Sequence, residues 1–117
     1  MLVPMTVVET PAFARESAAV LTEEERNELI AYLAADPEAG DVMPETGGAR
    51  KLRWRARGRG KRGGVRAIYY YHDGAIPLFL LNIFAKNDKA NLTKAERNEM
   101  KRLLPRLVAG YREKQQK

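Results

Sequence analysis

The chain contains no cysteine and only one histidine and one tryptophan among its 117 residues. These scarcities limit which kinds of catalytic and metal-binding sites the chain can form. Without cysteine there are no disulfides, no thiolate nucleophile and no cysteine-ligated metal. The longest apolar run, Ile76 to Ala85, is interrupted by Pro77 and Asn82 and is too short to span a membrane. Residues 1–10 lack the basic start and the long apolar stretch of a signal peptide. We therefore expect a cytoplasmic protein.

Familiar catalytic motifs are also lacking. No pair of carboxylates, Ser/His/Asp set or cluster of metal ligands has a suggestive spacing, and Gly58 to Gly64 lacks the Lys-Ser/Thr ending of a P-loop. The single histidine, His72, precedes Asp73 at an expected turn, where an exposed histidine is more often incidental than catalytic. We expect neither a metal nor any other cofactor.

Acidic residues are scarce in the second half of the chain, and positive charge gathers there. The net charge is +6, but residues 1–49 carry −8 and residues 50–117 carry +14. Residues 50–66 hold nine basic side chains and no acidic one. A local excess of this kind attracts polyanions and binds nucleic acid in a salt-dependent way. We expect RNA rather than DNA, because the two N-terminal helices are short and the second is acidic at its start.

Capping signals predict three helices. One runs from Pro11 to Val20, and a second starts at the Thr22–Glu25 capping box and stops at Asp36, so that the two form a helical hairpin. Another capping box at Thr93 opens a longer helix, in which Pro105 predicts a kink or a restart. The polar residues at the end of the chain, 112–117, are expected to fray.

Alternating and β-branched segments predict four strands, which cover residues 6–9, 49–57, 65–71 and 76–84. The turn signal Asp73-Gly74 pairs the last two strands in antiparallel fashion, and residues 36–48 are expected to form a loop. The order β-α-α-β-β-β-α predicts an α+β fold, with an antiparallel sheet of three or four strands and helices against one face. The length suits a single domain over residues 1–117.

Strand alternation indicates which side chains are available to RNA. Arg66 and Tyr70 share a face of the strand 65–71, and because an arginine needs solvent or an anion, we expect this face to be open and Tyr70 to be available for base stacking. Packing in the core is the alternative for this aromatic strand. On the strand 49–57, four basic residues point away from the apolar face: Lys51, Arg53, Arg55 and Arg57.

A basic site with an aromatic side chain is chemically sufficient to cleave RNA. RNA carries its own nucleophile, the 2′-hydroxyl, which attacks the adjacent phosphate once the backbone is bent into line. Arginine and lysine stabilise the developing charge, and a lysine of lowered pKa in a basic cluster moves a proton. The absence of a catalytic motif therefore does not exclude a ribonuclease.

Several segments, in this order, resemble the RelE superfamily of toxin–antitoxin toxins. Residues 64–71 read Gly-Val-Arg-Ala-Ile-Tyr-Tyr-Tyr, residues 81–87 read Leu-Asn-Ile-Phe-Ala-Lys-Asn, and residues 91–96 read Asn-Leu-Thr-Lys-Ala-Glu. With residues 48–54, the resemblance covers about residues 5–104. The Tyr-Tyr-Tyr and Ala-Lys-Asn signatures are most similar to the HigB-like branch.

The resemblance implies a microbial-ribonuclease-like fold that enters the ribosomal A site and cuts mRNA there without a metal. It also implies a cognate antitoxin, usually a small helix-turn-helix protein, which blocks the toxin. The toxin is brought to operator DNA only through its complex with this antitoxin. By position, Lys51 and Arg53 match the basic pair of the family, and Arg66 matches the strand arginine that binds phosphate. Phe84 and Lys86 match the end of the last strand, for stacking and for charge stabilisation or proton transfer.

The predicted site thus consists of a catalytic group and a wider RNA-binding group. The catalytic group is Lys51, Arg53, Arg66 and Lys86, and the RNA-binding group is Arg50, Arg55, Arg57, Tyr70, Phe84 and Lys89. The chain departs from some relatives in having no C-terminal histidine or tyrosine at a catalytic position, which leaves the general acid open. Two alternatives remain: a gyrase poison of the ParE kind with the same fold, and a non-catalytic domain that binds RNA or the ribosome.

Overall fold

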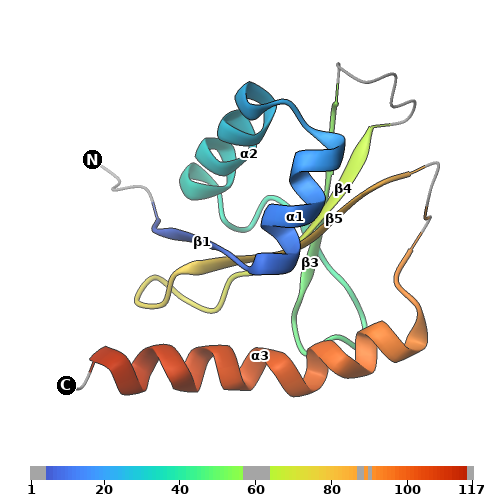
Figure 1. The fold of residues 1–117 in the computed structure, drawn as a ribbon. Helices are drawn as coiled ribbons and strands as arrows, with labels where there is room; N and C mark the ends of the chain where they lie inside the picture. The colour runs from blue at the N-terminus through green and yellow to red at the C-terminus, as the bar shows by residue number, and fades with distance from the viewer. Residues whose placement is uncertain (1–4, 57–63, 87–88, 90, 116–117) are drawn as a thin grey trace.

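The computed structural model describes residues 5–56, 64–86, 89 and 91–115, in which five strands and three helices are arranged around one sheet (Figure 1). In chain order the elements are β1 (Val7–Glu9), α1 (Pro11–Val20), α2 (Glu23–Ala35), β2 (Asp41–Val42), β3 (Arg50–Trp54), β4 (Val65–Tyr70), β5 (Leu78–Ala85) and α3 (Lys94–Gln115). The predicted α+β class is confirmed.

The sheet is mixed rather than purely antiparallel, and its strand order is β1-β5-β4-β3-β2. Strands β2 to β5 pair in antiparallel fashion, but β1 runs parallel to β5, with Val7 opposite Leu78. The parallel pairing arises because the chain passes through the helical hairpin and three further strands before it returns beside β1. The fifth strand, β2, lies in the segment predicted as a loop, where Asp41 and Val42 pair with β3.

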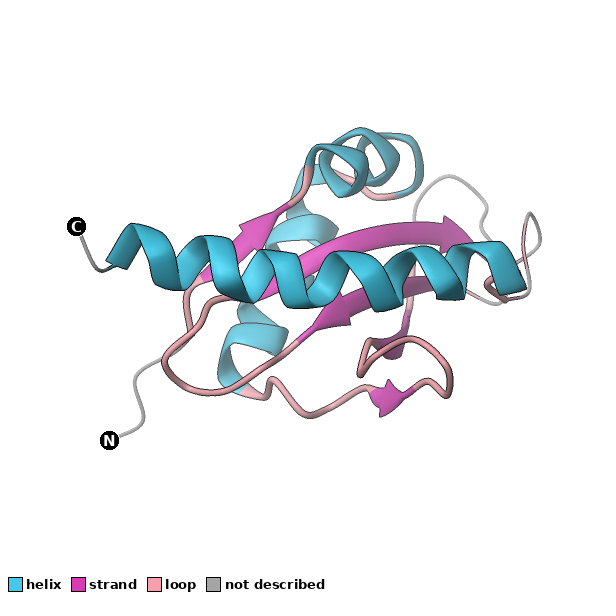
Figure 2. Ribbon diagram, turned by 90° about the horizontal axis from the view of Figure 1, so that it is seen from below, coloured by secondary structure: helices cyan, strands magenta, loops and turns pink. Residues whose placement is uncertain are grey.

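Helices cover both faces of the sheet, so the expectation of a single covered face was wrong. Helices α1 and α2 share one apolar cluster with β4 and β5, and α3 shares a second cluster with the opposite faces of the same strands (Figures 1 and 2). The physical reason is that β4 and β5 are buried on both sides, as their nearly continuous apolar sequences require.

All three helix starts follow the sequence signals, but the last helix does not break. Thr10, Thr22 and Thr93 each accept a hydrogen bond from a backbone N–H three residues later. Helix α3 continues through Pro105 to Gln115, so the predicted restart is absent and the helix includes residues expected to fray. Leu104 and Val108, on either side of Pro105, are buried against the sheet, and their packing keeps the helix in place.

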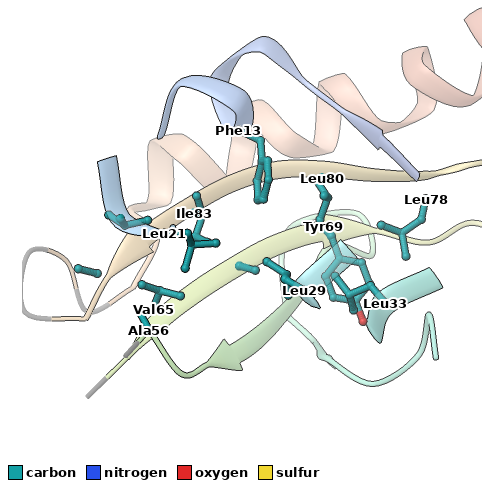
Figure 3. Packing of buried hydrophobic residues seen from close by; sticks show 13 residues of the cluster. Phe13, Leu21, Leu29, Leu33, Ala56, Val65, Tyr69, Leu78, Leu80 and Ile83 are labelled. Carbon is teal, nitrogen blue, oxygen red and sulfur yellow. The ribbon is translucent and has the colours of Figure 1, made fainter. Parts of the chain in front are cut away.

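An irregularity between β4 and β5 determines which side chains of β5 share a face. Ile68 lies opposite Asn82 and Tyr69 lies opposite Leu80, so Leu81 is an extra residue in β5. As a result Leu80 and Ile83 both face the cluster under α1 and α2 (Figure 3). Phe84 instead packs against the cluster on the α3 side.

Candidate functional site

Three side chains predicted for the site form a row across the sheet. Arg53 of β3 is paired with Arg66 of β4, and Arg66 is paired in turn with Phe84 of β5. Neighbouring strands lie about 4.8 Å apart, so the row brings two guanidinium groups and an aromatic ring together on the α3 side of the sheet. The resemblance to the RelE superfamily predicted this grouping, and the strand register explains why the three side chains lie next to one another.

Lys51 lies on the same side of β3 as Arg53. The intervening Leu52 and the following Trp54 both pack against the cluster under α1 and α2, and alternation then directs Lys51 and Arg53 toward the other face. Lys51 is paired with Ile68, two residues along β4 from Arg66. It therefore extends the positive charge of the row along β3.

Arg66 is buried, which differs from the open face predicted for it. Only 5% of its surface is exposed, and its Nη1 donates a hydrogen bond to the backbone oxygen of Val65 at 3.3 Å. Burial lowers the pKa of this guanidinium, and the neighbouring charge of Arg53 lowers it further. Arg53, in contrast, is exposed, so the row presents one accessible arginine beside a buried one.

Lys86 follows β5 at the end of the sheet where the row lies. Its backbone N–H donates to the oxygen of Gly64, at 3.3 Å, which fixes Lys86 beside the start of β4. The side chain is exposed. Gly64 is required at this point because its φ is +73° and a Cβ there would lie 2.5 Å from the backbone oxygen of Trp54.

Lys89 and Glu96 complete this end of the sheet. The Lys89 ammonium is ion-paired with the Glu96 carboxylate and lies 5.7 Å from the centre of the Phe84 ring. Burial acts to raise the pKa of Glu96, but hydrogen bonds from Lys89 and Thr93 and the charge of Lys89 outweigh it, so that the pKa is lowered. The sequence signalled Glu96 only as a capping residue of α3, and its contact with Lys89 was not predicted.

Two predicted RNA-binding residues lie away from the row. Tyr70 is at the far end of β4, about 13 Å along the strand from Arg66, and its hydroxyl is hydrogen-bonded to Nδ1 of His72 at 2.9 Å. Burial and the nearby Asp73 raise the pKa of Tyr70, and Arg112 partly offsets them. The ring packs against the α3-side cluster, which is the alternative considered for the aromatic strand.

Arg50 is on the opposite face of β3 from Lys51 and Arg53. Its Nη1 donates to the oxygens of Gly40, at 2.8 Å, and Glu38, at 3.2 Å, and its Nη2 lies 3.7 Å from a carboxylate oxygen of Glu38. These contacts hold the segment before β2 against β3. Arg55 follows β3 and is exposed, and Arg57 lies outside the described residues.

Other site types find no support in the part of the chain that the structure describes. No group of three or more histidine, aspartate or glutamate side chains in it could hold a metal ion. No described helix is both long enough and apolar enough to cross a membrane.

Comparison with known families gives one finding for nearly the whole chain. The family model of the RelE toxin of the RelE/RelB toxin–antitoxin system matches residues 5–117. This span contains every element of the sheet and every side chain of the row.

Proposed function

Because the chain belongs to the RelE family and is the toxin of a toxin–antitoxin pair, we propose that it is an endoribonuclease that cuts mRNA on the ribosome and needs no metal. The observation that supports this activity most directly is the cross-strand row of Arg53, Arg66 and Phe84. Lys51 and Lys86 flank it with two further positive charges. The assignment to the HigB-like branch stays a prediction.

The row suits a ribose–phosphate link bent for self-cleavage. In this reaction the 2′-hydroxyl gives up its proton as its oxygen forms a bond to phosphorus, the bond from phosphorus to the 5′-oxygen breaks, and the departing 5′-oxygen takes up a proton, which leaves a 2′,3′-cyclic phosphate and a 5′-hydroxyl end. The exposed Arg53 contacts the non-bridging oxygens, where negative charge increases in the transition state. Arg66, buried beside it on the neighbouring strand, adds a second guanidinium to the row.

Phe84 and Lys86 have separate roles in this proposal. The Phe84 ring offers a face on which a base of the mRNA stacks, which orients the link relative to the arginines. Lys86 is exposed at the end of β5 and is the candidate for neutralising or protonating the 5′-oxygen. Neither role requires sequence-specific base contacts, so the codon preference would come from the ribosome-bound conformation of the mRNA.

The toxin pairs with an antitoxin, as members of its family do. We propose that this partner is a small helix-turn-helix protein that blocks the toxin and brings it to operator DNA. The ribosome and mRNA are the proposed targets, and both present the phosphate-rich surfaces that a chain with +14 in its second half attracts.

Induced expression followed by sequencing of mRNA 5′ ends tests the activity. The wild type should arrest growth and produce ends within translated codons, whereas Arg66→Ala combined with Lys86→Ala should do neither. Arg102→Ala is the control for loss of surface charge, since it removes one positive charge from an exposed, ion-paired position on α3. A harmless wild type, or growth arrest with intact mRNA, would overturn the proposal, and the SOS response would then identify a gyrase poison. Salt-sensitive RNA binding without cleavage would identify a non-catalytic domain.

A further inference from the structure

The carboxylate of Glu96 holds two parts of the molecule at once. One oxygen accepts the backbone N–H of Thr93 at 2.8 Å, within the capping box that starts α3. The other oxygen is bound to the ammonium of Lys89. A helix cap requires only the contact of Glu96 with Thr93. The capping box therefore does not account for the contact of Glu96 with Lys89.

Lys89 is held by its backbone as well as by its side chain. Its N–H donates to the oxygen of Ala85 at 3.1 Å, which keeps it close to the end of β5. Its ammonium is 5.7 Å from the Phe84 ring centre, and Phe84 lies opposite Arg66. The ammonium is thus placed beside the aromatic ring of the row rather than extended into solvent.

The first turn of α3 is itself held in place, so the backbone that carries Glu96 is fixed. Nη1 of Arg97 donates to the oxygen of Pro44 at 2.7 Å, and its Nη2 donates to Oδ1 of Asn91 at 3.1 Å. Leu92 and Met100 are buried in the α3-side cluster. The position of the carboxylate is therefore determined by the fold on both sides of it.

We propose that Glu96 is a positioning residue that holds the ammonium of Lys89 beside the Phe84 ring, where Lys89 contacts a phosphate of the bound mRNA. This inference rests on the proposed ribonuclease activity. Lys89 touches the RNA, and Glu96 acts through Lys89 without touching it.

The charge of Glu96 gives this role a signature. Glu96→Gln keeps an acceptor for the Thr93 N–H, because glutamine also completes a capping box, but it loses the charge that holds Lys89. Removal of one negative charge should leave RNA affinity unchanged or tighter. A positioning role therefore predicts slower cleavage without weaker binding. A purely electrostatic role would improve both cleavage and binding, and a purely structural role would weaken both.

The experiment measures single-turnover cleavage of a short mRNA on purified ribosomes, the affinity for the same RNA by fluorescence anisotropy, and the melting temperature. We expect Glu96→Gln to cut at least about tenfold more slowly with undiminished affinity. Lys89→Met should lose as much of the cleavage rate, and Lys89→Arg should retain most of it. The double variant with Glu96→Gln and Lys89→Met should be no slower than Lys89→Met alone, since coupled residues are not additive.

Thr93→Ala is the control for the helix cap. It removes the hydroxyl that accepts the Glu96 N–H and leaves the Glu96 carboxylate in place, so it should lower the melting temperature without slowing cleavage. The positioning role is wrong, while the ribonuclease stands, if Glu96→Gln cuts at the wild-type rate or if Thr93→Ala cuts as slowly as Glu96→Gln. It is also wrong if the losses of rate in Glu96→Gln and Lys89→Met add in the double variant. A wild type that leaves ribosome-bound mRNA intact overturns the proposed function and this inference with it.

Discussion

Phe84 faces the same side of the sheet as Arg66 because Leu81 is an extra residue in β5. Before this bulge, Leu78 and Leu80 face the cluster under α1 and α2, and after it Ile83 and Ala85 do. In a regular strand, Phe84 would share a face with Leu80. The bulge therefore brings an aromatic ring and a buried arginine together on the α3 side.

This arrangement gives a direct test of base stacking. Phe84→Leu removes the aromatic face but keeps an apolar side chain in the cluster, and base–aromatic stacking is worth about 1–3 kcal/mol. We expect ribosome-dependent cleavage to slow by roughly fivefold to a hundredfold, while Phe84→Tyr stays close to wild type.

Tyr70→Leu is the matched control for this prediction, because it removes an aromatic ring from the same face of the sheet but from the far end of β4. Its cleavage rate should stay within about twofold of the wild type, since base stacking is confined to aromatic faces that the RNA reaches. A larger loss of cleavage rate in Tyr70→Leu than in Phe84→Leu would mean that the RNA binds at the Tyr70 end of the sheet and not, as we propose, at the Phe84 end.

Gly64 provides a prediction about stability. A Cβ at this residue would lie 2.5 Å from the Trp54 backbone oxygen, and φ is +73°, so Gly64→Ala should destabilise the protein by about 1–3 kcal/mol. Thermal unfolding followed by circular dichroism measures the effect. At Gly74 a Cβ meets nothing within 4 Å, so Gly74→Ala should leave the melting temperature nearly unchanged. Equal melting temperatures for the two variants would mean that the start of β4 tolerates a shift.

Local rules account for much of the fold, and long-range contacts account for what they missed. The capping boxes at Thr22 and Thr93 and the β-branched run of β4 depend on residues close in sequence, and each formed as predicted. The parallel pairing of β1 with β5 is invisible in the sequence because 71 positions separate Val7 from Leu78. The bulge at Leu81 is equally invisible, since an apolar run has no signal for an unpaired residue.

The site shows the same division. Alternation already separates Arg50 from Lys51 and Arg53, and the contacts of Arg50 with Glu38 and Gly40 agree with that separation. Alternation also placed Arg66 and Tyr70 on one face, but it could not show that α3 covers this face or that Arg66 is 5% exposed. Those facts depend on where a distant helix packs.

The lowered pKa of Glu96 predicts a dependence of stability on pH. The folded state favours the carboxylate over the acid, so the stabilisation is fully present above the usual value of 4.5 and is lost as the pH falls through the lower pKa of the folded state. The wild type should melt at a higher temperature than Glu96→Gln at pH 7, and this difference should shrink below pH 4.5. Melting curves of both proteins between pH 7 and the acid limit of folding check it. A difference that stays constant to low pH would mean that the ion pair with Lys89 does not form in solution.

The salt dependence of RNA binding should separate the exposed arginine of the row from other surface charges. Each phosphate contact contributes to the slope of log affinity against log salt, with about 0.7 per contact for single strands. Arg53 is exposed beside the buried Arg66, so Arg53→Ala should reduce the slope by roughly this amount and weaken binding similarly for all RNA sequences. Arg102→Ala removes the same formal charge from a position already paired with Glu99, and should leave the slope unchanged. Fluorescence anisotropy with one labelled RNA at several salt concentrations measures all three proteins. Equal slopes for wild type and Arg53→Ala would mean that the RNA binds elsewhere on the basic surface, because a phosphate held by Arg53 must release its counterion on binding.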